Sequence, residues 1–128
     1  MKKVDMFDAL KSDGKARIIQ ELVPGKQITL AHVIANPDPV LYQKLGLDPA
    51  ADYKTSAIGI ITLSPAETAI IAGDIATKAS GAELGFVDRF SGTLIVVGSV
   101  SQVEEAVLAV CTYVRETLGF TVCPITKT

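Results

Sequence analysis

The stretch Gly85–Gly98 constrains the fold most strongly, because it predicts a β-hairpin with a charged tip. It reads G-F-V-D-R-F-S-G-T-L-I-V-V-G: an apolar lead-in, a polar break at Asp88–Gly92 and a β-branched run. Gly92 can supply the positive φ that a tight turn needs. Since loops on rigid scaffolds often carry function, this tip is the first candidate site. A solvated turn with a local ion pair between Asp88 and Arg89 is the simpler alternative.

Length and composition suit one apolar domain that associates with other copies. The chain has 128 residues, of which 48% are hydrophobic but only 5% aromatic. Mean hydropathy is +0.38, which favours burial of surface against other copies. The longest run without a charged residue, 90–103, is too short to span a bilayer. A net charge of −2 without basic runs argues against nucleic acid, so we expect a cytosolic protein with neither membrane nor nucleic-acid partner.

Side chains that commonly carry catalysis are sparse. His32 is the only histidine, so a catalytic relay around Ser91 lacks its base. Because His32 lies in an apolar run, we expect it to have a hydrogen-bonded structural role. Cys111 and Cys123 have neither metal-site nor disulfide-framework spacing, and Cys111 suits a buried position in a helix. We therefore expect no enzyme activity, no metal and no cofactor, iron–sulfur clusters included.

Strands and helices alternate along the remaining chain. The segment 1–15 has a linker composition. A short amphipathic helix is the alternative, because Val4, Phe7 and Leu10 recur every third residue. Within the second expected strand, Ile28, Leu30 and His32 would share one face. The patterns predict strands over 16–23, 26–35, 56–63 and 120–125, and helices over 40–47, 64–78 and 101–118.

The two longer helices begin with similar motifs. Residues 64–67 read S-P-A-E and residues 101–104 read S-Q-V-E, so each serine is expected to cap and each glutamate, Glu67 and Glu104, to complete a capping box. Small residues on the first helix would let another backbone approach closely: Ala69, Ala72, Gly73 and Ala76. The second helix would carry an apolar face made of Val103, Ala106, Val107, Val110, Val114 and Leu118.

A faint internal repeat predicts the fold class. A strand, an S-x-x-E helix and the tripeptide Leu-Gly-Phe occur twice, ending at 84–86 and at 118–120. Two such units make an α+β, ferredoxin-like (split βαβ) sheet with both helices on one face. The strands within 16–35 would then be additions to that core.

Two motifs carry a resemblance to a known family. Residues 72–78 read A-G-D-I-A-T-K, and residues 85–92 read G-F-V-D-R-F-S-G. With the whole of Ala57–Val107, they resemble the bacterial microcompartment (BMC) shell domain, whose hexamers tile protein shells around metabolic enzymes. The family commonly has A-A-D-x-x-x-K at the first motif and G-Y-x-x-x-G-S-G at the second, so Phe90 replaces the first glycine of the pore loop.

The order of the motifs departs from the usual domain. Residues 31–37, A-H-V-I-A-N-P, are similar to the strand V-H-V-I-x-R-P that ends the family domain, but here they precede it. This displacement resembles the circularly permuted subgroup, and 18–126 is similar to shell proteins of ethanolamine- and propanediol-utilising compartments. The resemblance therefore implies a permuted BMC domain over 16–128 and a flexible or amphipathic extension over 1–15.

The resemblance implies three groups of site residues. The residues lining a pore on the six-fold axis would be Asp88, Arg89, Phe90, Ser91 and Gly92. One strand would join five copies of itself in a six-stranded β-barrel over the pore. This strand would consist of Arg17, Ile18, Ile19, Gln20, Glu21, Leu22 and Val23. The edge between hexamers would hold Lys78, Asp74 and Asn36, the last standing where the usual domain often has an arginine.

The resemblance implies a structural role inside the cytoplasm. The partners would be other copies in a homohexamer, other shell proteins and enclosed enzymes, in a compartment that metabolises ethanolamine, propanediol or choline. Six Phe90 rings would narrow the pore and make it a poor conduit, and the barrel or 1–15 would serve as a dock for enzymes. The competing hypothesis is a ferredoxin-like regulatory domain that binds a small molecule between subunits through glycine-rich loops.

Overall fold

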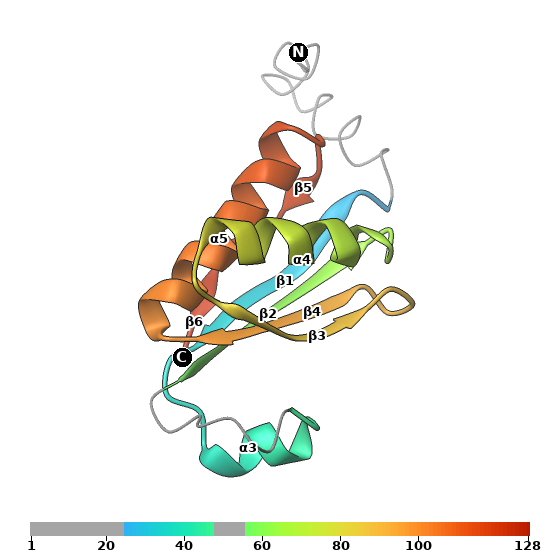
Figure 1. Ribbon diagram of the computed structural model, residues 1–128. Helices are drawn as coiled ribbons and strands as arrows, with labels where there is room; N and C mark the ends of the chain where they lie inside the picture. Colours follow the sequence, from blue (N-terminus) through green and yellow to red (C-terminus); the bar gives the residue numbers. More distant parts are fainter. Residues whose placement is uncertain (1–24, 48–55) are drawn as a thin grey trace.

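The computed structural model describes residues 25–47 and 56–128 (Figure 1). Its elements are β1 (Gln27–Ile34), α3 (Pro39–Lys44), β2 (Ala57–Ser64), α4 (Thr68–Ala79), β3 (Glu83–Asp88), β4 (Thr93–Gly98), α5 (Val100–Glu116), β5 (Thr121–Val122) and β6 (Thr126–Lys127). The predicted strand 16–23 and the segment 1–15 lie outside the described residues. Within the described part of the chain, no helix is both long and apolar enough to cross a bilayer.

One mixed sheet organises these elements. Its strand order is β3-β4-β2-β1-β5, and β6 also pairs with β1. The helices α4 and α5 pack together on one face of the sheet, as predicted, while α3 lies apart from them (Figure 1). The expected α+β class and the hairpin formed by β3 and β4 are confirmed.

The core has two parts because β2 is buried on one face and partly covered on the other. Ala57, Ile61 and Leu63 contribute to the larger cluster, which α4 and α5 cover. Ile58, on the opposite face, packs in a smaller cluster with Tyr42 of α3. This coverage explains the apolar run from Ala57 to Ile61, and the second face turns polar at Thr62, where the cover ends.

The prediction that the strands before residue 36 are additions to the core is wrong for β1. This strand lies between β2 and β5, in the place where a ferredoxin-like order would put the last strand of the repeat beside β2. Its Ile28, Ala31 and Val33 are buried in the larger cluster, which is the physical reason for its central position. The internal repeat predicted the layers correctly but not the order of the strands.

A bulge corrects the predicted inner face of β1. The pairing with β2 shifts between Ile28 and Leu30, so Thr29 is the extra residue of a β-bulge. Leu30 is consequently 41% exposed, whereas Ala31 is buried beside Ile28 on the inner face. The hydroxyl oxygens of Thr29 and Thr62 lie 2.6 Å apart at this bulge.

The predicted start of the first long helix is also wrong. Ser64 is still the last residue of β2, where it pairs with Gln27, so it does not cap a helix. The helix α4 begins at Thr68 after a tight turn, in which the N–H groups of residues 68–70 donate to carbonyls three positions earlier. Glu67 occupies the N-cap position and makes no side-chain capping bond.

The capping box of α5 lies two residues earlier than predicted. The N–H of Gln102 donates to Ser99 Oγ at 3.2 Å, and the N–H of Ser99 donates to Gln102 Oε1 at 2.9 Å. Glu104, free of a capping role, pairs with Lys127 Nζ at 2.9 Å. The expected apolar face of this helix is confirmed, with Leu118 only partly buried.

The expected last strand is split into two short ones, both parallel to β1. β5 pairs at Gln27 and Ile28, and β6 pairs at His32 and Val33. His32 contacts two threonine hydroxyls, with Nδ1 2.6 Å from Thr126 Oγ1 and Nε2 2.9 Å from Thr128 Oγ1. The predicted structural, hydrogen-bonded role of this histidine is confirmed.

Candidate functional site

The hairpin turn at 89–92 is held rigidly at the end of the sheet. Gly92, with φ of +77°, donates its N–H to the Asp88 carbonyl at 2.9 Å. Its own carbonyl accepts the N–H of Leu63 at 2.8 Å, which ties the turn to the end of β2. A β-carbon on Gly92 would collide with the Leu63 carbonyl oxygen, so glycine is required here for both conformation and space.

Asp88 closes the turn from its other side. Its carboxylate accepts the Phe90 N–H at 2.8 Å and the Ser91 hydroxyl at 2.9 Å. These two hydrogen bonds, the Phe90 N–H first, hold the pKa of Asp88 below its ordinary value because they stabilise the ionised form.

The ion pair between Asp88 and Arg89, the simpler alternative from the sequence, does not form within the described residues. The guanidinium of Arg89 instead lies over the Phe90 ring, with its central carbon 5.0 Å from the ring centroid. Phe90 is 81% exposed, the most of any large hydrophobic side chain in the described chain. The turn therefore presents an aromatic ring and a cation to its surroundings, on a backbone that is fixed underneath.

The other predicted site residues lie away from this turn. Asp74 and Lys78 form the expected i,i+4 ion pair on the exposed side of α4, at 2.9 Å, a contact worth about 0.3–0.5 kcal/mol at a solvated surface. Asn36 is exposed directly after β1. The barrel residues 17–23 lie outside the described residues, so their arrangement stays a prediction.

The described side chains do not assemble a metal-binding cluster. No three His, Cys, Asp or Glu residues within the described ranges lie close enough to hold an ion. Cys111 and Cys123 are free thiols, and the predicted burial of Cys111 is confirmed. Burial first, and then the neighbouring Cys123, raise the pKa of Cys111 to about 11, so its thiol is protonated near neutral pH.

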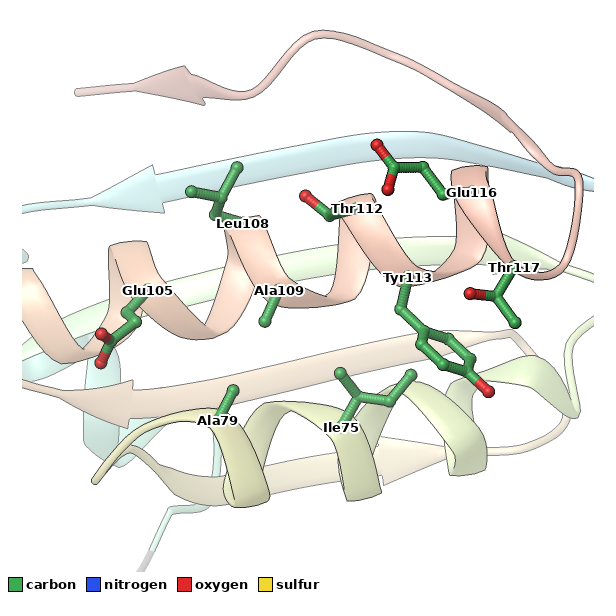
Figure 2. Close-up of a pocket in the computed structure, with 9 residues that line it drawn as sticks. All are labelled: Ile75, Ala79, Glu105, Leu108, Ala109, Thr112, Tyr113, Glu116 and Thr117. Carbon is green, nitrogen blue, oxygen red and sulfur yellow. The ribbon is translucent and has the colours of Figure 1, made fainter.

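A groove between α4 and α5 was not anticipated from the sequence. Figure 2 shows its lining, in which Ile75 faces Tyr113 across the gap between the two helices. Its volume is about 610 Å³. Leu108 and Tyr113 are 57% and 41% exposed and fall outside the buried stripe of α5. Their place outside that stripe was the sequence signal that could have indicated the groove.

Comparisons with known proteins agree with the resemblance. The family model described as BMC domain matches residues 57–126. The bacterial microcompartment shell protein EutS of Salmonella typhimurium (strain LT2) is 53% identical over 88% of this chain and 97% of its own length. The shell protein PduU of the same organism is 54% identical over 88% of this chain and 93% of its own. The shell protein CutR of Streptococcus intermedius is 50% identical over 87% of this chain and 91% of its own length.

Solved structures give the same result. A flat hexamer of CutR superimposes with a TM-score of 0.75 and 45% identity, covering 81% of this chain and 92% of that one. A screw form of CutR gives a TM-score of 0.72 and 46% identity, covering 82% of this chain and 100% of that one.

Substitution of Gly92 tests the anchoring of the turn. Gly92→Ala should cost about 1–2 kcal/mol for the left-handed backbone, plus the collision with the Leu63 carbonyl. Gly119→Ala is the matched control, because Gly119 has φ of +74° and open space around it. Denaturant unfolding at one fixed protein concentration should show the larger loss for Gly92→Ala. Equal losses would mean that the contact with Leu63 does not hold the turn.

The titration of Asp88 tests the hydrogen bonds within the turn. Its carboxyl signal in NMR spectra should titrate below the ordinary pKa of 3.8, and Ser91→Ala should move the midpoint upward. Because the folded pKa is the lower one, the stabilisation from this carboxylate is present above the ordinary pKa and is lost as pH falls through the lowered pKa. Ser101→Ala, on α5, serves as the control and should leave the midpoint unchanged. An unmoved midpoint in Ser91→Ala would contradict the assignment.

Proposed function

The chain belongs to the BMC domain family of bacterial microcompartment shell proteins, and we propose that six copies of it form a hexameric tile of such a shell. Identity of 50–54% to three shell proteins supports a structural role rather than an enzymatic one. It also favours this role over the regulatory ligand-binding domain that the sequence left open. The CutR hexamers, at 45% identity, support the six-fold ring.

The β3–β4 turn carries the proposal for the centre of the tile. We propose that Asp88, Arg89, Phe90, Ser91 and Gly92 surround the six-fold axis. The support is physical: a rigid turn that exposes 81% of a phenylalanine gains by meeting its own copies, which would cover the apolar surface. Asp88 and Gly92 shape the turn, so the surfaces that face the axis belong to Arg89 and Phe90. Six such rings would narrow the pore.

The edge of the tile is proposed to lie along α4. Asp74 and Lys78 are both exposed and lie 2.9 Å apart, so both charged groups are available to a neighbouring tile. Asn36, exposed after β1, joins this edge and replaces the arginine of the usual domain with a shorter, uncharged side chain. We expect the contacts between neighbouring hexamers to be weaker there for that reason.

We also propose that the domain is circularly permuted and that residues 17–23 form a six-stranded barrel with their copies. The central place of β1, ahead of the matched range 57–126, supports the permutation. The hydrogen-bonding edges of β1 are occupied by β2 on one side and by β5 and β6 on the other. A strand that precedes β1 therefore has no place beside it, and closure with other copies would remove the resulting free edge.

The partners and the pathway are proposed at a coarser level. Other shell proteins along the edges and enclosed enzymes are the further partners that we propose. The three relatives are almost equally similar to this chain, so their names do not single out one compartment. We propose a compartment that metabolises ethanolamine, propanediol or choline.

The assembly state tests this function first. Light scattering should give six times the chain mass of 13.5 kDa, and electron microscopy should show sheets or tubes. Lys78→Ala should keep the hexamer mass but abolish the sheets, because the proposed edge loses its cation. Lys44→Ala removes another exposed lysine, on α3, and should leave the sheets intact. A stable dimer or trimer that never tiles would overturn the proposal.

Crosslinking tests the position of the turn. In Phe90→Cys, mild oxidation should join neighbouring subunits in pairs, seen as a dimer band on a non-reducing gel, because six copies would lie around one axis and each new thiol can form one disulfide. Val40→Cys, which places the same thiol at an exposed site on α3, should give no dimer beyond that of the unmodified protein. The absence of a dimer band in Phe90→Cys hexamers would place the turn away from the axis.

A further inference from the structure

Exposed apolar side chains gather at both side edges of the sheet. β3 lies at one edge of the strand order, while β5 and β6 lie along the other (Figure 1). The surface at the first edge, the β3 flank, consists of Ile70, Leu84 and Phe86. The surface at the second edge, the β6 flank, consists of Leu108 and Ile125. All five side chains are 40–57% exposed, and exposed apolar patches commonly mark an interface.

The β3 flank is one surface shared by a helix and a strand. A β-carbon on Gly73 would lie 3.3 Å from Leu84 Cδ2, so α4 packs directly on β3 at this point. Ile70 lies three positions before Gly73 and therefore projects from the same side of the helix. Phe86 lies three positions before the turn at 89–92. The β3 flank is thus continuous with the turn that we place on the six-fold axis.

The β6 flank is held together by an ion pair. Lys127 Nζ lies 2.9 Å from Glu104 Oε2, which ties β6 to α5. Leu108 follows Glu104 by four positions and lies on the same face of the helix. Figure 2 draws Leu108 on the side of α5 that is turned away from α4. Ile125 lies two positions before Lys127, so both apolar residues lie beside the ion pair.

The two flanks lie at a similar level along the strands. Residue pairing runs from Phe86 of β3 through β4, β2 and β1 to Thr126 of β6. Phe86 and Thr126, the neighbour of Ile125, therefore stand level at opposite edges of the sheet. A rotation keeps each atom at its distance from the axis. A rotation about an axis at the turn can consequently bring the β3 flank of one copy onto the β6 flank of another.

We propose that the β3 flank of each copy packs against the β6 flank of the next copy around the ring. This contact rests on the hexamer proposed above and names the two surfaces that hold it together. A six-fold ring needs a head-to-tail contact between two different surfaces, because a surface that pairs with itself gives a two-fold dimer. The CutR hexamers, at 45% identity, support the ring itself. Burial of the five apolar side chains would stabilise the contact.

Two charge substitutions in the full chain test the contact. Ile70→Glu on the β3 flank and Leu108→Glu on the β6 flank should each abolish the hexamer in light scattering and leave the mass of one chain. Each variant keeps one intact flank, so an equal mixture of the two should give twice the chain mass of 13.5 kDa. The mixture should not close into a ring, because closure would bring the two introduced carboxylates together.

Ile71→Glu and Tyr113→Glu are the matched controls. Both side chains are exposed on the same two helices but lie outside the flanks, so both variants should keep the hexamer. Loss of the hexamer in these controls but not in the flank variants would assign the contact to the helix layer and overturn the proposal. Flank variants that circular dichroism shows to be folded, but that never pair in the mixture, would overturn it as well.

Paired cysteines test the same contact without adding charge. In a Cys123→Ser chain, the remaining native thiol, Cys111, is buried. With Phe86→Cys and Ile125→Cys together, a short bismaleimide should join successive subunits into a ladder of up to six chains on a denaturing gel. Either cysteine alone should give no ladder and no dimer, because each flank meets the other flank and not its own copy.

The outcomes separate this contact from the proposed function. Hexamers of the double-cysteine variant that give no ladder, or dimers formed by one cysteine alone, would overturn the contact and leave the hexamer standing. Hexamers that survive both Ile70→Glu and Leu108→Glu would do the same. An unmodified protein that forms no hexamer would overturn the proposed function itself.

Discussion

The central place of β2, packed on both faces and paired on both edges, is the constraint on which the rest of the structure depends. One face of this strand packs under α4 and α5, and the other packs against α3. Its backbone is paired on both sides, with β1 and β4. The end of this fixed strand, at Leu63, then donates the hydrogen bond that holds Gly92. The rigid turn that we place on the six-fold axis is therefore an extension of the core rather than a separate loop.

Periodicity predicted the helices and strands well, while local hydrogen bonds decided their ends. The stripe of valines on α5 and the apolar run of β2 follow directly from burial, so both were predictable. The start of α4 was not, because the S-P-A-E motif also fits a serine that remains in the sheet. The bulge at Thr29 could not be predicted from the apolar pattern, because its effect is to reverse which residues after it face the core. The central place of β1 depends on contacts with residues almost a hundred positions away, which no local pattern contains.

The candidate site was predictable to a different degree in its parts. The charged tip, its exposed ring and the need for glycine at position 92 could all be predicted from the hairpin motif. The capping of the turn by Asp88 could not, since an adjacent arginine offered a simpler partner. The groove was missed because Leu108 and Tyr113 line it only together with Ile75, which lies on another helix. Motifs within one segment were informative, whereas surfaces shared by two segments needed the fold.

The pairing of β1 with β5 and β6 has a consequence for how the chain is made. His32 and Thr126 are 94 positions apart, and their side chains contact each other beside the paired strands. During synthesis β1 leaves the ribosome before α5, β5 and β6, so its outer edge and the apolar side that α5 covers stay unpaired until those later elements follow. Contacts of such long sequence separation slow folding, because the loop must close before the contacts form. The nascent chain thus exposes an apolar strand while the intervening residues are made, and chaperones that hold extended apolar segments can bind it there.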